Sequence, residues 1–274
     1  MSQGNATNKY KSKSLENKNK TEEKIMTKTK TTKRFAAILL TLAMAFGMFS
    51  MIGATSVSAA TDKVSLYSLN PTFSKYGGTS YEAFIQTNDN AGNQEVFVHY
   101  NYMDSMDWQD AKAEYVTTLN DGSKIWKANF TSWNTKFAIK FVADGREYWD
   151  NNNNNGNDYT RNDILGVAPI TSERLGYQLY GNKFQINAVL QNYAYQKNVY
   201  VRYTTDGWNS YNDQALGYDK TNENGTETWT TTLNLPSNMD YSKFEYAICY
   251  QVNGTEFWAN NFGANYDAYY YIHH

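Results

Sequence analysis

The strongest constraint on the fold of this chain is an internal repeat. Tyr100 recurs as Tyr203 and Trp126 recurs as Trp229, both at an offset of 103 residues. A constant offset between matching aromatic residues indicates one fold that is present twice. A repeat of about 100 residues has the size of a domain and is too long for a solenoid unit.

The offset changes only where loops are expected. Trp149 recurs as Trp258 at 109 residues, because the second copy has a six-residue insertion around Leu235–Asp240. Tyr159 then recurs as Tyr266 at 107 residues, so the first copy has the longer Asn-rich loop. The segment 163–176 lacks the aromatic density of both flanks. We therefore expect one module over 61–166 and a second over 167–274.

Both copies have the pattern of β-strands. Apolar and polar residues alternate in EVFVHY and KFAIKF of the first copy and in NVYVRY and KFEYAICY of the second. Alternation with period two, rich in aromatic and β-branched residues and broken by DG, NG and Asn clusters, is typical of half-buried antiparallel strands. Several short strands within about 100 residues predict an all-β sandwich for each copy.

The N-terminal part has the order of an export signal. Residues 1–34 are polar and Lys-rich, residues 35–54 are apolar and uncharged, and small residues follow in TSVSAATDK. This order predicts a signal peptide over 1–60 with a long basic first part, cleaved near Ala60, and a secreted or cell-surface protein. The alternative is an uncleaved anchor, because 20 apolar residues can span a bilayer.

Charge and composition exclude several classes. Residues 1–60 carry ten basic and three acidic side chains, whereas the remaining 214 carry 15 basic and 24 acidic ones. An acidic mature part argues against a nucleic-acid partner. Of the 44 aromatic residues, 40 follow residue 60, which is too many for a disordered chain. One Cys excludes a disulfide scaffold.

One motif occurs in both copies. A strand runs into a Gly turn, an aromatic pair and then Asn, as FAIKFVADGREYWDNNNNNGNDY at 137–159 and YAICYQVNGTEFWANNFGANY at 246–266. Upstream, we expect a Trp on the loop after the first clear strand of each copy, Trp108 and Trp208. This combination resembles carbohydrate-binding module family 21, which binds starch and also occurs in the glycogen-targeting subunits of protein phosphatase 1. The resemblance covers nearly all of 62–274, twice, and implies immunoglobulin-like sandwiches that bind α-glucans without cutting them.

The resemblance also implies two kinds of glucan site. A third aromatic of the main site in some fungal members falls on Ala138 and Ala247, so that contact is missing. At the position where the family pattern has Asp, the first copy keeps Asp150 and the second has Ala259. The main site maps to Trp208, Trp258, Asn260 and Asn265 in the second copy, and to Trp108, Trp149, Asn151 and Asp158 in the first.

A second site of the family uses one Tyr before the first clear strand and one beyond the Trp loop. In the second copy these are Tyr195 and Tyr218. The first copy keeps Tyr115, but Gly92 stands where the first Tyr is expected.

The chemistry of these residue types agrees with the resemblance. A flat indole can cover the apolar face of a glucose ring at little entropic cost, and Asn amides offer a donor and an acceptor to paired hydroxyls. We expect Trp108 and Trp208 to be exposed, Trp149 and Trp258 to contact ligand, and Trp126 and Trp229 to lie in the core. Starch, glycogen or amylose are the expected partners.

Enzyme and metal hypotheses fit the sequence poorly. Asp150 and Asp158 could mimic a glycosidase pair, but Ala259 and Asn265 stand at the equivalent places of the second copy. The Asn run from Asn151 resembles a calcium loop but has Asn162 where Glu is required. We expect no catalysis, no metal and no cofactor. An adaptor that carries an enzyme, a phosphatase-like protein or a cell-surface partner to glucan is the alternative function.

Overall fold

The computed structural model describes residues 63–73, 78–103, 107–133, 135–152, 158–173, 179–180 and 182–268. The predicted signal peptide over 1–60 and the middle of the Asn run, 153–157, lie outside these residues. In the part of the chain that is described, no helix is long and apolar enough to cross a membrane.

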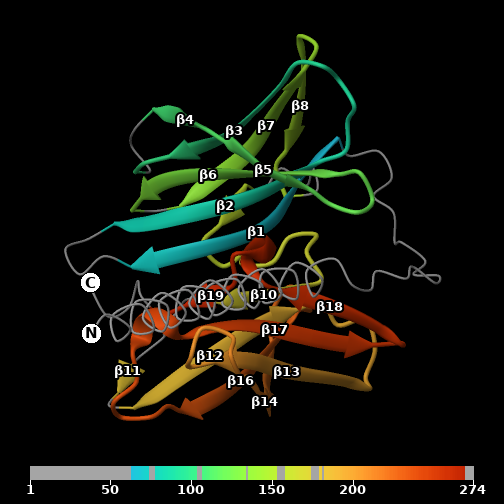
Figure 1. Ribbon diagram of the computed structural model, residues 1–274. Helices are drawn as coiled ribbons and strands as arrows, with labels where there is room; N and C mark the ends of the chain where they lie inside the picture. The colour runs from blue at the N-terminus through green and yellow to red at the C-terminus, as the bar shows by residue number, and fades with distance from the viewer. Residues whose placement is uncertain are drawn as a thin grey trace, which may run out of the picture. The chain divides into compact units, whose positions relative to one another are not determined.

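The first half of the chain folds into two antiparallel sheets (Figure 1). Together they form a β-sandwich, as the alternating sequence predicts. One sheet has the order β1–β2–β6–β5, and the other has the order β4–β3–β7–β8 with β9 also paired to β7. The strands are β1 (Val64–Phe73), β2 (Thr79–Thr87), β3 (Gln94–Asn101), β4 (Trp108–Lys112), β5 (Glu114–Thr118), β6 (Lys124–Ser132), β7 (Lys136–Ala143), β8 (Arg146–Asp150) and β9 (Tyr159–Thr160).

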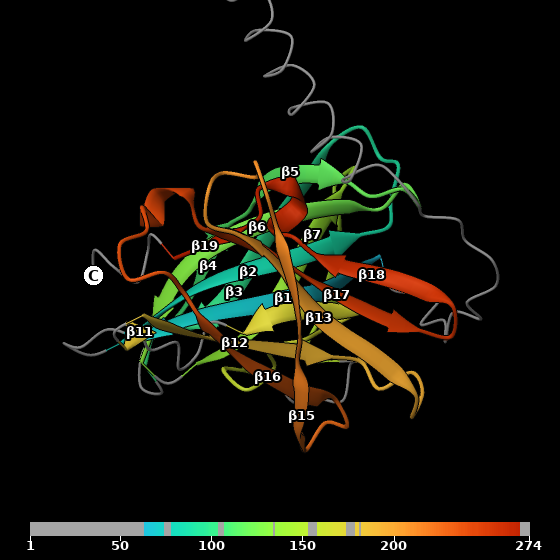
Figure 2. The ribbon, with the colours of Figure 1, turned by 60° about the horizontal axis from the view of Figure 1, so that its bottom comes forward.

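The second half repeats this order with one further short strand, β11, and is turned towards the viewer in Figure 2. One sheet has the order β10–β12–β16–β15 with β11 paired to β12, and the other has the order β14–β13–β17–β18 with β19 paired to β17. The elements are β10 (Ile170–Glu173), β11 (Leu179–Tyr180), β12 (Lys183–Leu190), β13 (Lys197–Thr204), β14 (Asn212–Ala215), β15 (Gly217–Thr221), β16 (Glu227–Asn234), the 3-10 turn η1 (Tyr241–Lys243), β17 (Glu245–Val252), β18 (Thr255–Ala259), the 3-10 turn η2 (Asn261–Gly263) and β19 (Tyr266–Asp267).

Strand register carries the same repeat as the sequence. Tyr100 of β3 pairs with Phe137 of β7, and Tyr203 of β13 pairs with Tyr246 of β17. The β5–β6 and β15–β16 ladders also shift register at matching places, directly after Tyr115 and directly after Tyr218. The two halves are therefore two copies of one sandwich, in agreement with the offsets found in the sequence.

Each sandwich has its own apolar core. In β3, Val96 and Val98 are fully buried and Phe97 and His99 face outward, as expected from period-two alternation. Burying one such large side chain stabilises the fold by about 1.5–3 kcal/mol. The first core is built mainly from Leu66, Leu69, Ile85, Val96, Val98, Phe137, Ile139 and Phe141, and the second from Phe184, Ile186, Val199, Val201, Leu233, Phe244, Tyr246, Ile248 and Tyr250.

The segment between the sandwiches is packed. Ile164, Leu165 and Ala168 are buried and form a small cluster with Val189 of β12. Backbone hydrogen bonds join this segment to β1: Leu69 N donates to Ile164 O at 2.8 Å, Gly166 N to Tyr67 O at 3.1 Å, and Val167 N to Leu66 O at 2.8 Å.

Gly166 is required by this close approach. A Cβ atom at this position would lie 1.9 Å from the carbonyl oxygen of Leu66, which is backbone and cannot move aside cheaply. The Gly166 carbonyl in turn accepts a hydrogen bond from Gln191 Nε2 at 2.8 Å. Between Ile164 and Ala168 the segment that joins the two sandwiches is therefore bonded to β1 through its backbone.

Candidate functional site

The outward face of the β4–β3–β7–β8 sheet brings together Trp108 and Trp149. The ring of His99 in β3 stacks on Trp108 at 5.0 Å and 13°, and meets the edge of Trp149 at 5.4 Å and 84°. Trp108 is 38% exposed and Trp149 is 43% exposed. The two Trp residues predicted for the first copy are therefore linked through His99 into one row of rings.

Charged neighbours hold this row. His99 Nδ1 lies 2.6 Å from Asp110 Oδ1, and Lys140 Nζ donates to Asp110 Oδ2. The ammonium of Lys140 also lies 4.7 Å from the centre of the Phe97 ring and 5.7 Å from that of Trp149, within cation–π range. Burial raises the pKa of Asp110, but the hydrogen bonds from Lys140 and His99 outweigh it and hold that pKa below its usual value.

The second sandwich has a matching row on the β14–β13–β17–β18 sheet. The guanidinium of Arg202 lies between Tyr211, at 4.4 Å, and Trp258, at 5.5 Å. Two parallel hydrogen bonds, Nε to Oδ1 at 2.8 Å and Nη2 to Oδ2 at 2.7 Å, join Arg202 to Asp213. Trp258 also meets Tyr200 at 5.7 Å and 87°. Because the carboxylate of Asp213 stabilises its charge, Arg202 has a raised pKa.

Strand register shows which site residues of the two copies are equivalent. The sequence suggested that Trp108 and Trp208 both lie on a loop, but Trp108 is the first residue of β4, where it pairs with Asn101. Tyr203 pairs with Asn212 at the corresponding end of β14. Counting back one residue places Tyr211, and not Trp208, at the position of Trp108.

Trp208 has a different role at the end of β13. It lies in the loop before β14 with φ of 64°, and its backbone N donates to Thr204 Oγ1 at 3.0 Å. Its indole Nε1 donates to Glu245 Oε2 at 2.5 Å, and Asn265 Nδ2 donates to the same oxygen at 2.9 Å. The structure therefore joins the predicted residues Trp208 and Asn265 through Glu245.

Asp206 shapes the loop that carries Trp208. Its carboxylate accepts hydrogen bonds from Ser210 N at 3.0 Å, Ser210 Oγ at 2.7 Å and Thr204 Oγ1 at 2.8 Å. These bonds lower the pKa of Asp206 to about 2. The loop is consequently fixed by an ionised carboxylate at any pH above that range.

Trp208 and Trp258 serve different ends of the same face. Trp258 of β18 pairs with Cys249 of β17, which in turn pairs with Tyr200 of β13. Trp208 lies in the loop after Thr204, and Thr204 is four residues beyond Tyr200 along β13. Four residues of a strand span about 13 Å. The predicted main site of the second sandwich is therefore elongated along the strands.

The Asn residues of the second copy shape their own loop. Asn260 Oδ1 accepts from Gly263 N at 3.2 Å, and Asn261 Nδ2 donates to Asn265 O at 3.2 Å. Asn261 and Asn265 have φ of 49° and 59°, a region that Asn tolerates better than most residues. The predicted Asn260 thus has a capping role, and Asn265 bonds towards Trp208.

The structure describes the loop that carries the predicted polar residues of the first copy only in part. Asp158 is half-buried at the far side of the Asn run. The Oδ1 atom of Asn151 is buried, with no hydrogen-bond partner among the residues that the structure describes. Residues 153–157, between the two, lie outside them, so this part of the predicted site stays a prediction.

Asp150 has a structural role. It is buried, and its Oδ2 accepts from Leu66 N at 3.0 Å and from the Tyr159 hydroxyl at 2.6 Å. These bonds tie β8 to β1 and β9. Burial, with the charge of Asp150 adding to it, raises the pKa of Tyr159 and keeps its hydroxyl a donor. Ala259, at the equivalent position, is buried without such a carboxylate.

The second predicted site has exposed Tyr rings in both copies. Tyr195 is 97% exposed, and Tyr115 and Tyr218 are each 54% exposed. Tyr218 meets Trp229 at 6.0 Å and 84°, and Tyr115 meets Trp126 at 5.7 Å and 79°. The two copies thus present the same edge-to-face pair at this place.

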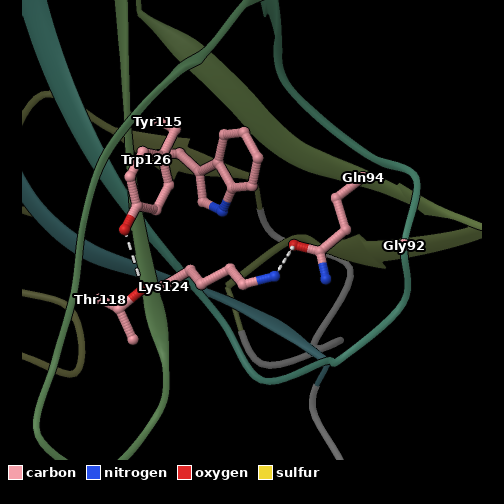
Figure 3. A pocket seen from close by; sticks show the side chains of 6 residues that line it. All are labelled: Gly92, Gln94, Tyr115, Thr118, Lys124 and Trp126. Atoms are coloured by element: carbon pink, nitrogen blue, oxygen red, sulfur yellow. Dashed lines mark hydrogen bonds between the residues drawn. The ribbon is translucent and has the colours of Figure 1, made fainter.

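In the first copy this pair borders a shallow pocket of about 240 Å³ (Figure 3). Trp126, expected in the core, is half-buried, and its Nε1 donates to Thr87 Oγ1 at 2.9 Å. Trp229 is likewise half-buried and donates to Glu227 at 2.9 Å. The register shifts follow directly after the pairs Tyr115–Trp126 and Tyr218–Trp229. The pocket is lined by Gly92, Gln94, Tyr115, Thr118, Lys124 and Trp126.

The two copies differ in charge at this pocket. In the first, Lys124 Nζ donates to the neutral Gln94 Oε1 at 3.1 Å, as Figure 3 shows. In the second, Lys197 forms an ion pair with Glu227 at 2.8 Å. The pocket of the first copy is open where Gly92 replaces the Tyr of the second.

Sequence reasoning missed His99, Asp110, Arg202, Tyr211 and Asp213. The signal was present, because the offset of 103 residues carries His99 onto Arg202, and it carries Trp108 onto Tyr211 and Asp110 onto Asp213. Only strand register shows that these side chains share one outward face with Trp149 and Trp258.

Comparison with protein families gives one match. Residues 178–268 match the carbohydrate/starch-binding module of family 21. Protein phosphatase 1 regulatory subunit 3B of Bos taurus is 38% identical over 80 residues, which are 28% of each chain. Glycogen-binding subunit 76A of Drosophila melanogaster is 36% identical over 78 residues, 28% of this chain and 12% of that one. The chain thus spans about a quarter or less of these relatives.

Two solved structures are similar in sequence. The starch-binding domain of Rhizopus oryzae glucoamylase, solved with β-cyclodextrin and maltoheptaose, is 27% identical, covers 36% of this chain and 92% of its own, and gives a TM-score of 0.31. The carbohydrate-binding module of the muscle glycogen-targeting subunit of protein phosphatase 1 is 28% identical, covers 36% and 73%, and gives 0.32.

Proposed function

We propose that the protein is an exported, non-catalytic protein that binds α-glucan chains through both of its sandwiches, because residues 178–268 match the carbohydrate/starch-binding module of family 21. The observation that carries this proposal is the row of rings on the outward face of each sandwich. In the first sandwich Trp108 and Trp149 are 38% and 43% exposed, and in the second Tyr211 is 53% exposed. Such rings leave apolar surface in contact with water and offer flat surfaces to sugar rings.

The polar groups beside the rings support binding of a neutral ligand. Asp110 pairs with Lys140 in the first row, and Asp213 pairs with Arg202 in the second. A face whose charges are already paired suits an uncharged polysaccharide better than a charged one.

The absence of cleavage is part of the proposal. Asp150, one of the two carboxylates that could mimic a glycosidase, is buried and bonded to Leu66 and Tyr159. A carboxylate used in this way is unavailable as a general acid. Export rests on the signal-peptide pattern of 1–60 and is proposed on that pattern alone.

The test uses the purified chain from residue 61 onward. Co-sedimentation with insoluble starch should retain the protein, and a Trp149→Ala/Trp258→Ala variant should stay in solution while melting at a similar temperature. Two faces in one chain should also favour polymer over oligosaccharide by avidity, about 10²–10⁴-fold at most. Equal retention of both proteins, or release of reducing sugar above that of the variant, would contradict the proposal.

A second function is an adaptor that brings a partner to glucan. Its support is the similarity to regulatory subunits of protein phosphatase 1, which extends over 28% of the relative. Affinity capture from the surface fraction of the native cell, with and without amylose, would separate the two. A partner retained only by the glucan-bound protein favours the adaptor.

A further inference from the structure

We propose that Tyr211 and Arg202 are glucan-contacting residues that extend the ring of Trp258 into a platform for two consecutive glucose units. This inference rests on the proposed function and adds to it, because neither residue belongs to the predicted site. It assigns the binding face of the second sandwich to the row Tyr211–Arg202–Trp258.

The position of Arg202 limits the distance between the rings of Tyr211 and Trp258. Its guanidinium lies 4.4 Å from the centre of Tyr211 and 5.5 Å from that of Trp258, so the two ring centres are at most about 10 Å apart. Two bonds to Asp213 restrain the guanidinium plane. A platform held in this way loses little side-chain entropy when ligand binds.

Exposure points to a ligand. Tyr211 is 53% exposed although it packs on Arg202, so much of its ring is open to solvent. The bonds to Asp213 use Nε and Nη2 of Arg202. We assign the remaining nitrogen, Nη1, as the donor to a sugar hydroxyl at the junction of the two units.

The strand beside this row has room for it. Arg202 pairs across the sheet with Ala247, and His99 pairs with Ala138. Both Ala residues carry only a methyl group on the face that bears His99 and Arg202, and both are 6% exposed. Some family members have a third aromatic ring where this chain has Ala138 and Ala247. We infer that the edge strand supplies this ring instead, as Trp108 in the first sandwich and Tyr211 in the second.

The first sandwich repeats the arrangement with other residues. Trp108, His99 and Asp110 stand where Tyr211, Arg202 and Asp213 stand in the second. An ion pair that served only to hold the edge strand would not need an aromatic ring beside it in both copies. The ring is kept while its identity and that of the central side chain change, which points to a shared stacking role.

The experiment isolates the second sandwich within the full mature chain. A Trp108→Ala/Trp149→Ala background removes the row of the first sandwich, and maltoheptaose is titrated by calorimetry. Tyr211→Ala in this background should weaken maltoheptaose binding about tenfold, the loss expected for one stacked ring. Tyr211→Trp should retain or improve binding, because the first sandwich has Trp at this place.

Tyr193→Ala is the matched control. Tyr193 is 49% exposed, but its ring packs on Tyr250 and Phe257, away from the row. It should leave maltoheptaose binding unchanged, and thermal melts check that each variant is folded.

The two proposals fail differently. Unchanged affinity of Tyr211→Ala, with Trp258→Ala impaired, would overturn the inference and leave the proposed function standing. Equal loss from Tyr211→Ala and Tyr211→Trp would also overturn it, because stacking would not explain the effect. If neither the mature chain nor the background binds starch or maltoheptaose, both proposals fall.

Discussion

Trp208 and Glu245 are joined by a hydrogen bond of 2.5 Å from the indole Nε1 to Oε2. Because Asn265 donates to the same oxygen, one carboxylate positions both a ring and an amide of the predicted site. The corresponding residue of the first sandwich is Lys136, at an offset of 109, which cannot accept such bonds. The two copies therefore differ at this carboxylate.

This bond gives the first prediction. Glu245→Ala should lower the free energy of unfolding of the second sandwich by about 1–2 kcal/mol, since a partly buried hydrogen bond to a charged group is lost. It should also weaken maltoheptaose binding by freeing Trp208. Lys136→Ala is the control in the first sandwich. Urea melts of the two variants that shift alike would show that Glu245 has no special role.

A second prediction separates binding rings from structural ones. Trp258→Ala should impair starch binding with little change in melting temperature, because Trp258 lies on the outward face. Trp229 packs against the core and donates to Glu227, so Trp229→Ala should cost about 3 kcal/mol, near the lower end for a large aromatic. Calorimetric melts and starch co-sedimentation together test both, and similar melting of the two variants would refute the distinction.

How much of this was visible in the sequence depends on the feature. Alternation in NVYVRY and KFEYAICY predicted β13 and β17, and the repeat predicted two sandwiches, because both follow from local pattern. The half-burial of Trp126 and the match of Trp108 with Tyr211 did not follow. Both become visible only when neighbouring strands are paired, because alternation within one strand carries no information about the neighbouring strand.

A third prediction concerns the pocket of the first sandwich. Gly92 has free space around the position of a Cβ atom, so a side chain fits there without strain. Gly92→Tyr should restore the second ring beside Tyr115 and strengthen binding of maltoheptaose in a background that lacks the main rows. Gly92→Ala, which adds a methyl group and no ring, is the control. A gain that appears equally in both variants would mean that backbone stiffening, and not stacking, is responsible.

A fourth prediction follows from Cys249. This free thiol is fully buried, and burial raises its pKa from about 9 to about 12. The unfolded chain ionises it at lower pH than the folded chain, so its contribution to stability is complete below about pH 9 and is lost as the pH rises towards 12. Cys249→Ala should therefore flatten the fall of stability with pH over this interval.

The pH measurement has a direct companion. Native protein at pH 8 should resist a thiol-specific reagent and react only after urea unfolding. Rapid labelling of the native protein would show that the thiol is accessible and would remove the basis of the pH prediction.

The fifth prediction concerns the segment between the sandwiches. Limited proteolysis should spare residues 161–169, because their backbone is bonded to β1. Gly166→Ala forces a Cβ atom against Leu66 O and should destabilise this packing by about 1–3 kcal/mol and open the segment to cleavage. A native-like digestion pattern for Gly166→Ala would contradict the close approach.

The same packing bears on how such a pair of modules can evolve. Modules joined by a free linker can be exchanged, lost or duplicated one at a time, because neither depends on the join. Here Ile164, Gly166 and Val167 supply backbone partners to β1, and Leu165 and Ala168 bury against Val189. A recombination break inside this segment would leave the first sandwich with unpaired strand groups and the second with an uncovered apolar residue. Loss or exchange of one sandwich on its own would therefore destabilise the other.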